Sequence, residues 1–299
     1  MNVLITGGAG YIGYELTKCL MNNVAINHIT VYDNFLQANY QCLKDLAAAN
    51  VSVIRADMLD ERKLKHALKD IDFVCHLAAV RRAPYNEEYT HLFEQVNHWG
   101  TAGLCSLLAT SQVSKVIHVS SAAVYGTSSK PFTVADEPMP STPYAYSKLN
   151  GEKQLVRVQP NRDVVILRLG HVFGYSLAMH YGSLINKFNL AMAFHEPLLV
   201  HGCGNQIRPY IHIDRVVQSI AYFLSADYQE QAGLYNIYDF NLSINDILQA
   251  YQDLSLNFET IHVSQQQRLN DLILSGNELQ QFIGKPKEIT AYLQQSLLA

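Results

Sequence analysis

A tyrosine and a lysine lie four residues apart in the stretch PYAYSK, residues 143–148. In a helix, residues i and i+4 share a face, so Tyr144 and Lys148 would point the same way, whereas Tyr146 would point elsewhere. A free phenol has a pKa of about 10 and is a weak base at neutral pH. A nearby ammonium group favours the phenolate. The pair could therefore act as a general base that removes a proton from a sugar or alcohol hydroxyl.

The same spacing also occurs in exposed polar strips on helices, so the surrounding sequence has to decide between the two readings. The stretch VSSAAVYG, residues 119–126, ends a predicted strand one β-α unit before the tyrosine. A serine at that strand end could hydrogen-bond the substrate oxygen that the tyrosine deprotonates. This arrangement favours a catalytic pair.

A glycine-rich loop follows the first predicted strand and opens a predicted helix. TGGAGYIG, residues 6–13, contains a GxGxxG pattern that ends at Gly13 and is preceded by Gly7. Glycine permits the tight turn and the approach of a pyrophosphate, and the helix N-terminus offers free N–H groups. Asp33, twenty residues past Gly13, could accept the adenosine ribose hydroxyls. The pattern favours a dinucleotide site over a simple turn, and Asp33 favours NAD over NADP because it would repel a 2′-phosphate.

The elements that must position these residues alternate in the first half of the chain. Strands are predicted at 3–6, 28–33, 51–57, 73–79, 115–121 and 164–170, and helices at about 11–22, 40–49, 60–69, 89–112 and 144–157. Several of the strands are apolar on both faces, as buried parallel strands are. Repeated β-α units predict an α/β fold with a Rossmann-type, doubly wound parallel sheet covered by helices on both faces.

The rhythm changes after Gly174, where we expect a smaller, mixed α/β C-terminal substrate lobe. A helix is predicted at about 183–194, a short strand at 198–202, a helix at about 214–225 and a strand at 234–239 that could rejoin the sheet; the rest is mixed and mostly helical. We expect a NAD-binding Rossmann domain of residues 1–174, to which 211–239 returns. The substrate lobe would consist of 175–210 and 240–299.

Composition narrows the class of protein. With 48% hydrophobic and 16% charged residues, the chain of 299 residues is expected to be globular. A net charge of −4 and a pI near 6.3 give no sign of a nucleic-acid partner. No apolar run approaches the ~20 residues of a membrane span, and the start resembles a first strand and not a signal peptide. Five scattered cysteines without a CxxC predict neither disulfides nor a metal site, and a cytoplasmic protein is expected.

Together, these motifs resemble the extended short-chain dehydrogenase/reductase family, and within it the nucleotide-sugar epimerases of the UDP-glucose 4-epimerase type. The resemblance covers essentially the whole chain and includes YDN (32–34), HLAA (76–79) and VNHWGT (96–101). It implies that Ser121, Tyr144 and Lys148 are catalytic. It also implies NAD contacts from Gly7, Gly10, Tyr11, Ile12, Gly13, Asp33, Asn34, Asp57, Met58, Leu77, Ala78, Ala79, Arg81, Asn97, Tyr144 and Lys148, with Arg81 in the place of a family lysine.

The resemblance extends to the substrate. GCGNQIRPYIHID, residues 202–214, is similar to the family stretch whose arginine binds the pyrophosphate of the sugar nucleotide, here Arg208. RLND resembles a C-terminal motif and implies substrate contacts from Arg268 and Asp271. His171 stands where the family often has an asparagine near the substrate phosphate, although a buried structural histidine is the alternative. Ser121 would also contact the sugar.

Three functions remain open. The first is NAD-dependent epimerisation of a nucleotide sugar at C4 through a transient 4-keto intermediate, since Ala122 and Ala123 stand where family dehydratases and decarboxylases carry an acidic residue. The second is an NAD(P)H-dependent 4-keto nucleotide-sugar reductase, and the third a non-enzymatic dinucleotide-binding regulator. The resemblance also implies a homodimer through the helices at about 89–112 and 144–157. The apolar run at 102–109 would equally suit packing on the sheet.

Overall fold

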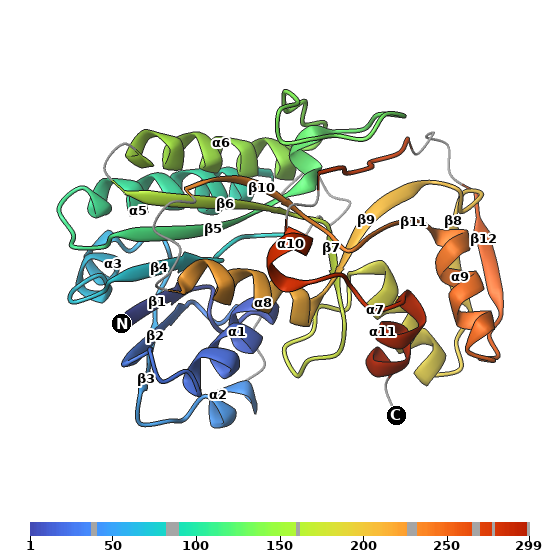
Figure 1. Cartoon of the computed structure of the whole chain (residues 1–299), viewed down its shortest axis with the longest axis horizontal. Coiled ribbons are helices and arrows are strands. Elements are labelled where there is room, and N and C mark those ends of the chain that lie inside the picture. Colours follow the sequence, from blue (N-terminus) through green and yellow to red (C-terminus); the bar gives the residue numbers. More distant parts are fainter. Residues whose placement is uncertain are drawn as a thin grey trace.

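The computed structural model describes residues 1–36, 41–81, 90–159, 162–225, 232–264, 270–276 and 279–297 (Figure 1). Within these residues, parallel strands form one large sheet in the N-terminal part of the molecule. In spatial order they are β10 (Gly233–Ile237), β6 (Asp163–Leu169), β5 (Lys115–Ser121), β4 (Phe73–His76), β1 (Asn2–Thr6), β2 (His28–Asp33) and β3 (Val51–Arg55). The chain winds outward from β1 in both directions, so the predicted doubly wound fold is confirmed.

Helices cover both faces of this sheet (Figure 1). One layer contains α1 (Tyr11–Met21), α2 (Gln41–Asp45) and α8 (Ile213–Leu224); the other contains α3 (Glu61–Ala67), α5 (Thr101–Leu108) and α6 (Pro143–Val158). Alternation along β1 explains the two layers, because Val3 and Ile5 pack toward α1 and α8, whereas Leu4 packs toward α3 and α5. Apolar residues on both faces of a strand are therefore what this burial requires.

Residues at the ends of two predicted strands leave the sheet. The strands predicted at 51–57 and 73–79 end at Arg55 and His76, and the residues that follow become loops. In a parallel sheet, the loops at the carboxyl edge are where ligands bind. The first residues of each segment thus form a strand of the sheet, and the last residues line a cavity instead of pairing with a neighbouring strand.

The helix predicted at about 89–112 is divided into three segments. α4 (Thr90–Phe93) continues into η2 (Glu94–Gly100), a π-helical segment, and then into α5. This region packs closely on α6, because a Cβ at Gly151 would lie only 2.7 Å from the carbonyl oxygen of Asn97. A π-helical turn widens the helix locally. It lies at the point where α6 makes this close approach.

A second group of elements follows the sheet, at the right of Figure 1. It contains β7 (His171–Phe173), α7 (Leu184–Ala193), β8 (Leu198–His201), β9 (Ile207–His212), β11 (Phe240–Ser243), α9 (Ile244–Asp253), β12 (Thr260–Val263) and α11 (Ile289–Ser296), whereas α10 (Leu279–Ile283) packs on α8. Among the described strands, β11, β9 and β7 form a small mixed sheet, and β12 pairs with β8. Side chains from α7, α9 and α11 share a separate apolar core with this sheet.

The return of the chain to the large sheet is visible at β10, which pairs with β6 in parallel. The small sheet takes β7 and β9 from either side of the expected boundary at residue 174. The division into 1–174 with 211–239, and 175–210 with 240–299, stays a prediction. No helix within the described ranges is long and apolar enough to cross a membrane.

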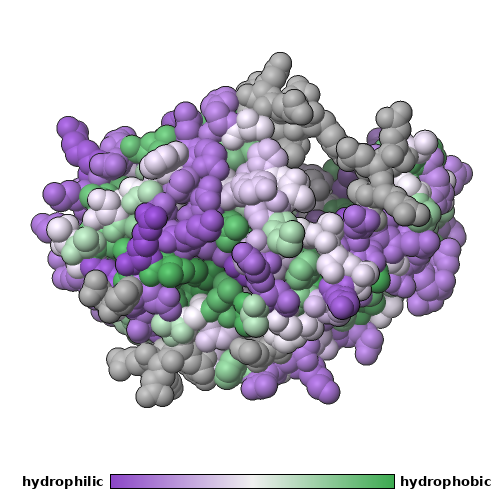
Figure 2. All heavy atoms as spheres, turned by 90° about the horizontal axis from the view of Figure 1, so that it is seen from above, coloured by the Kyte–Doolittle hydropathy of each residue, from purple (hydrophilic) through white to green (hydrophobic). Residues whose placement is uncertain are grey.

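Large side chains are exposed on η2 and α6. Trp99, Tyr146 and Val156 are 60%, 53% and 52% exposed. Figure 2 views the molecule from above, and hydrophobic side chains gather in a band on the half that holds the large sheet. The exposed side chains of Trp99, Tyr146 and Val156 would suit a subunit contact, and the homodimer stays a prediction.

We predict that Gly13→Ala destabilises the fold by about 1–3 kcal/mol and abolishes dinucleotide binding, because overpacked sites force backbone shifts. A Cβ there would lie 2.3 Å from the Gly7 carbonyl oxygen and 2.5 Å from the Gly8 Cα. Urea unfolding and NAD titration measure both effects. Gly103→Ala is the control, since its Cβ would meet nothing closer than 3.6 Å. It should be neutral or stabilising; equal behaviour of the two variants would contradict the prediction.

Candidate active site

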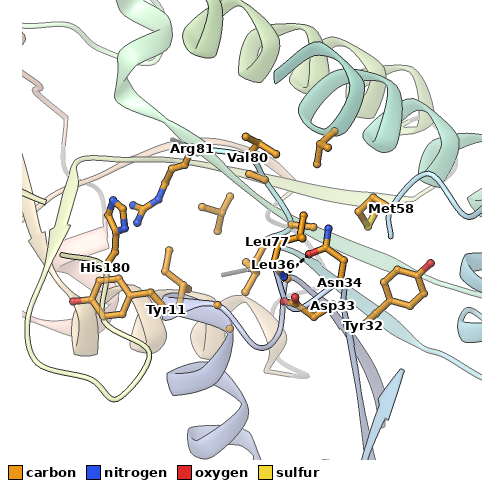
Figure 3. A pocket seen from close by; sticks show the side chains of 18 of the residues that line it. Tyr11, Tyr32, Asp33, Asn34, Leu36, Met58, Leu77, Val80, Arg81 and His180 are labelled. Carbon is orange, nitrogen blue, oxygen red and sulfur yellow. Dashed lines mark hydrogen bonds between the residues drawn. The ribbon is translucent and has the colours of Figure 1, made fainter. Parts of the chain in front are cut away.

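A cavity of about 230 Å³ opens at the carboxyl edge of the large sheet (Figure 3). It is lined by Gly7, Gly10, Tyr11, Ile12, Gly13, Tyr32, Asp33, Asn34, Leu36, Ala56, Asp57, Met58, Leu77, Ala78, Ala79, Val80, Arg81, Val96, Val119, Ser120, Tyr144, Lys148, Ala178, Met179 and His180. The residues predicted to contact NAD are all among these except Asn97. Five strands, β1 to β5, thus bring to one place segments that lie far apart in the sequence.

The glycine loop forms one wall of the cavity. Gly7 has a φ of +69°, and its N–H donates to the Tyr32 carbonyl at 2.8 Å. A Cβ at Gly7 would lie 2.7 Å from the Ala78 nitrogen, so the loop touches the segment after β4 directly. Gly10 precedes α1 and contributes no side-chain cap. The first N–H groups of α1 are therefore free to bind an anion.

Asp33 ends β2 and lies at the opposite part of the cavity from Arg81 (Figure 3). Its carboxylate accepts hydrogen bonds from the N–H groups of Ala9 at 3.1 Å and Phe35 at 2.7 Å. Burial raises the pKa of Asp33, and these two bonds act in the other direction. The neighbouring Asn34 donates to Asp57 at 2.9 Å, which fixes the ends of β2 and β3 relative to each other.

The start of α6 carries the predicted catalytic pair. Thr142 caps the helix by accepting from the Ala145 N–H at 3.2 Å, and Pro143 occupies the first turn. Tyr144 and Lys148 both line the cavity, whereas Tyr146 is exposed. The i, i+4 spacing thus places the two side chains as predicted.

Charges near Tyr144 partly offset its burial. Burial raises the pKa of Tyr144, whereas the Arg81 guanidinium and then the Ser121 hydroxyl lower it. The sequence had pointed to Lys148 for this effect and did not predict it for Arg81. Ser121 ends β5 and also accepts from the Ala123 N–H at 3.2 Å, so its hydroxyl is held beside the tyrosine.

Lys148 is 3% exposed, and its ammonium group donates to the Val119 carbonyl at 2.6 Å. Burial lowers the pKa of Lys148 to about 8, although the Glu152 carboxylate raises it. A lysine with this pKa is near the midpoint of its titration at slightly alkaline pH. Its charge state therefore depends on the groups around it.

Asn97 lies behind the cavity wall. Its side-chain oxygen accepts from the Val80 N–H at 2.8 Å, and its amide nitrogen donates to the Val80 carbonyl at 2.9 Å and to the Ser147 hydroxyl at 3.0 Å. Asn97 is not part of the cavity lining, and its direct contact with the cofactor stays a prediction. Asn97 instead ties the segment after β4 to η2 and α6, because its amide mimics a strand partner for Val80.

The predicted substrate residues lie on the small sheet and the nearby C-terminal segment. Arg208, on β9, donates to the carbonyls of Ile207 at 2.7 Å and Asn270 at 2.8 Å, and Asp271 accepts from the Ile207 N–H at 2.8 Å. They are not part of the cavity lining described above. Arg268, the other predicted arginine, lies outside the described residues.

His171 begins β7, and its ring lies 5.6 Å from the Tyr210 ring. The residue is exposed to solvent, yet neighbouring protein atoms still remove part of the hydration of its ring. This loss of hydration, followed by the charges of Arg208 and Arg81, lowers the pKa of His171 to about 4. The imidazole is therefore neutral at pH 7 and could serve as a hydrogen-bonding group but not as a cation.

Sequence reasoning missed part of the lining: Tyr32, Leu36, Ala56, Val80, Val96, Val119, Ser120, Ala178, Met179 and His180. Ser120 precedes the predicted Ser121, and its strand position was the available signal. The segment that holds His180 comes after β7, far from the other lining residues, and no motif marks it. In Figure 3, His180 and Arg81 point toward one another across the end of the cavity near Tyr11.

Two histidines lie beneath Lys148 on neighbouring strands. His76 and His118 are fully buried, and their ring centroids are 5.0 Å apart. His76 bonds the hydroxyls of Thr6 and Thr101 at 2.8 Å and 2.9 Å, whereas the ring nitrogens of His118 have no hydrogen-bond partner among the described residues. Burial, and then the Lys148 charge, lower the pKa of His76 to about 3 and that of His118 well below its usual range.

A family model supports the same identification as this geometry. The model described as the NAD dependent epimerase/dehydratase family matches residues 3–237. The chain belongs to this family. The predicted membership of the extended short-chain dehydrogenase/reductases and the predicted cofactor, NAD, are thereby confirmed. Membership of this family supports the prediction that the chain is an enzyme of the extended short-chain dehydrogenase/reductase type.

Individual relatives agree with this family. Human dTDP-D-glucose 4,6-dehydratase is 30% identical over 251 residues, which cover 79% of this chain and 68% of the relative. The UDP-N-acetylglucosamine 4-epimerase of Methanobrevibacter ruminantium M1, solved with UDP-N-acetylmuramic acid, is 25% identical with a TM-score of 0.87, covering 99% of this chain and 96% of that one. The UDP-glucuronic acid 4-epimerase of Bacillus cereus, solved with UDP-glucuronic acid and NAD, is 24% identical with a TM-score of 0.88, covering 99% and 98%, and supports the fold.

The residues present fit the cofactor of the epimerase/dehydratase family. A Cβ would fill the loop at Gly7 and Gly13, so the chain keeps that space clear of side chains. The free N–H groups of α1 would hold a pyrophosphate, and Asp33, at the end of β2, would accept the hydroxyls of the adenosine ribose. Lys148 and Tyr144 lie at the other end, where the nicotinamide half would be held.

We predict that Asp33→Asn lowers the preference for NAD over NADP at least about tenfold, because the amide keeps an acceptor oxygen but removes the charge that repels a 2′-phosphate. Calorimetric titration of both dinucleotides into cofactor-stripped protein measures the ratio. Asp253→Asn, at the end of α9, serves as the control. An unchanged ratio in Asp33→Asn would contradict the assignment of Asp33.

We predict that His118→Phe makes the fold less sensitive to acid. Because the folded-state pKa of His118 is below its unfolded value of about 6.5, the unfolded state gains a proton that the native state refuses, and stability is lost as the pH falls below about 6.5. The variant should lose about 1–2 kcal/mol less unfolding free energy than the parent between pH 7 and pH 5. Urea unfolding at both pH values tests this. His66→Phe, on the exposed side of α3, should lose as much unfolding free energy between pH 7 and pH 5 as the parent does. If His118→Phe also loses as much as the parent, the prediction is refuted.

Proposed function

We propose that the protein is an NAD-dependent epimerase of a nucleotide sugar that inverts C4 through a transient 4-keto intermediate. The observation that carries this proposal is the hydrogen bond between Ser121 and Tyr144 beside a dinucleotide cavity. In the sequence, Ser121 is followed by two alanines, Ala122 and Ala123. Two structural relatives, from Methanobrevibacter ruminantium M1 and Bacillus cereus, are 4-epimerases of UDP-sugars.

The roles of the side chains follow from their positions. Tyr144, as phenolate, accepts the proton of the O4 hydroxyl, and Ser121 holds the same oxygen by a hydrogen bond. Bound NAD supplies the acceptor of the C4 hydride and later its donor. After the ketone has turned over, C4 would regain a hydrogen on its other face, and Tyr144 would return the proton to O4. Arg81 stabilises the phenolate by its charge.

The reaction is an internal redox cycle, so the cavity needs a base for an oxygen-bound proton and no second base for carbon. Asp33 and Asp57 are the carboxylates that line the described cavity, and both lie at its adenosine end. Ala122 and Ala123 begin η3 (Ala122–Tyr125) right after Ser121. An elimination of water would require proton removal from carbon by a group at this position, which favours epimerisation over the dehydratase activity of the human relative.

Substrate binding is proposed for the small-sheet residues. Arg208 can bind a diphosphate with its planar guanidinium group, and neutral His171 can donate a hydrogen bond nearby. Asp271 holds β9 in place through the Ile207 N–H. The nucleotide part would then lie against the C-terminal segment, and the sugar would reach Tyr144.

We predict that Tyr144→Phe lowers the rate of C4 inversion at least about a hundredfold, because general base catalysis contributes about 10²–10⁴-fold. The assay incubates UDP-glucose, UDP-glucuronic acid and UDP-N-acetylglucosamine with the protein and follows the sugar resonances by NMR. Bound NAD, released by denaturation, should be unchanged. Tyr146→Phe, two residues on and exposed, is the matched control and should keep full activity.

Two outcomes would contradict the proposal. Equal turnover by Tyr144→Phe would remove the tyrosine from the reaction. A 4-keto-6-deoxy product from the parent protein would identify a dehydratase, and a stoichiometric demand for added NADPH would identify the 4-keto-sugar reductase.

A further inference from the structure

A carboxylate lies on the catalytic face of α6, one turn beyond the lysine. Tyr144, Lys148 and Glu152 follow one another at intervals of four residues, which places them along one side of the helix. Glu152 is 4% exposed and does not line the cavity. It therefore neighbours the catalytic lysine from inside the protein, without reaching the cofactor or substrate.

Strong bonds hold Glu152 in position. Arg168, on β6, donates to its two carboxylate oxygens, from Nε at 3.1 Å and from Nη2 at 2.6 Å, and the Ser120 hydroxyl also donates to it. The Arg168 guanidinium lies 4.6 Å from the centre of the Tyr125 ring, and the Tyr125 hydroxyl donates to Asn236 at 2.8 Å. Side chains from β5 and β6 thus bind the buried carboxylate directly, and Tyr125, in the segment after β5, packs against the arginine.

This ion pair is poorly explained as a stabilising device. Burying both partners costs hydration, and well-packed apolar residues often stabilise a fold as much as a buried salt bridge does. Arg168 and Glu152 have side chains that are only 4% and 5% exposed. A role in setting the charge of a neighbour accounts for the pair better.

Lys148 is the neighbour whose charge Glu152 can stabilise. It donates a hydrogen bond to the neutral Val119 carbonyl, and the groups facing it from β4 and β5 are the neutral rings of His76 and His118. Tyr144 precedes it on α6. Burial drives the pKa of Lys148 down to about 8, and the Glu152 carboxylate is the group that opposes this shift.

We propose that Glu152 is a positioning residue whose carboxylate, fixed by Ser120 and Arg168, keeps Lys148 in its ammonium form. The inference rests on the proposed function, in which Tyr144 acts as a phenolate beside NAD. We expect the ammonium form of Lys148 to add to the effect of Arg81 on the phenolate and to hold the nicotinamide half of NAD. Lys148 is charged below its pKa and neutral above it. Removing the Glu152 charge should move the loss of the ammonium form to lower pH.

The test measures Lys148 directly. In protein labelled with ¹³Cε-lysine, the Lys148 resonance, assigned with Lys148→Arg, is titrated by NMR in the parent, Glu152→Gln and Glu94→Gln. In Glu152→Gln we expect the Lys148 pKa to fall by about one unit or more, since a nearby opposite charge shifts a pKa by about 1–3 units. Glu94→Gln is the matched control, because Glu94 also accepts from α6, at 3.3 Å from Asn150, on the outer side. It should leave the titration unchanged.

A second variant guards against misfolding. Glu152→Gln alone leaves the buried Arg168 unpaired, which can destabilise the fold. In Glu152→Gln/Arg168→Met, both charges are absent, and the Lys148 pKa should still fall, but by less than in the single variant, because the Arg168 cation no longer opposes the ammonium form. An unchanged Lys148 pKa in the folded variant, single or double, would overturn the inference.

Activity separates this inference from the proposed function. If both hold, the alkaline limb of kcat/KM for C4 inversion moves to lower pH in Glu152→Gln by the same amount as the Lys148 titration. A purely structural Glu152 would lower the rate equally at all pH values and leave the limb in place. If the parent protein inverts no sugar while the Lys148 titration shifts as expected, the proposed function fails and the role of Glu152 in charging Lys148 stands.

Discussion

The close approach of bare backbone around the loop after β1 is the constraint on which the site depends. Gly13, in the first turn of α1, comes so near to Gly7 and Gly8 that a methyl group has no room, and Gly7 likewise meets Ala78 after β4. This contact fixes α1 against two central strands and aims its free N–H groups along the carboxyl edge of the sheet. The ends of β2, β3 and β5 and the start of α6 then enclose one cavity, so the adenosine end and the catalytic end hold their separation.

Burial within this cavity drives ionisable groups toward their neutral forms. It raises the pKa of Tyr144 and lowers that of Lys148, which is the opposite of what proton abstraction requires. The chain supplies a separate compensation for each: the Arg81 guanidinium acts on the phenol, and the Glu152 carboxylate on the ammonium group. In a low-dielectric site, a fixed charge acts strongly over a short distance and does not have to reorganise during the reaction. One charge for Tyr144 and another for Lys148 can therefore stabilise both ionised forms.

Much of the fold and of the cofactor wall could be predicted, because both depend on local patterns. Apolar runs bounded by loops gave the strands of the sheet, and the motif residues from Gly7 to Ala79 lie where strands end. What escaped prediction depends on tertiary contacts. The amide of Asn97 binds the Val80 backbone instead of facing the cavity, since η2 and α6 pack too closely to leave it exposed. His180 reaches the site from a segment without periodicity, and the partnership of Glu152 with Arg168 joins a helix to a strand with no shared motif.

Reaction type is a finer property than fold, because dehydratases and epimerases share this architecture. The distinction has to come from a few side chains at the end of β5. There the backbone turns into η3 directly after Ser121, and residues 122 and 123 are both alanine. Methyl groups at these positions can exclude water but cannot take a proton from carbon. Under the proposed function, one oxygen-directed base and a bound hydride carrier would be enough for a cycle that begins and ends at the same carbon, which is what an epimerase requires.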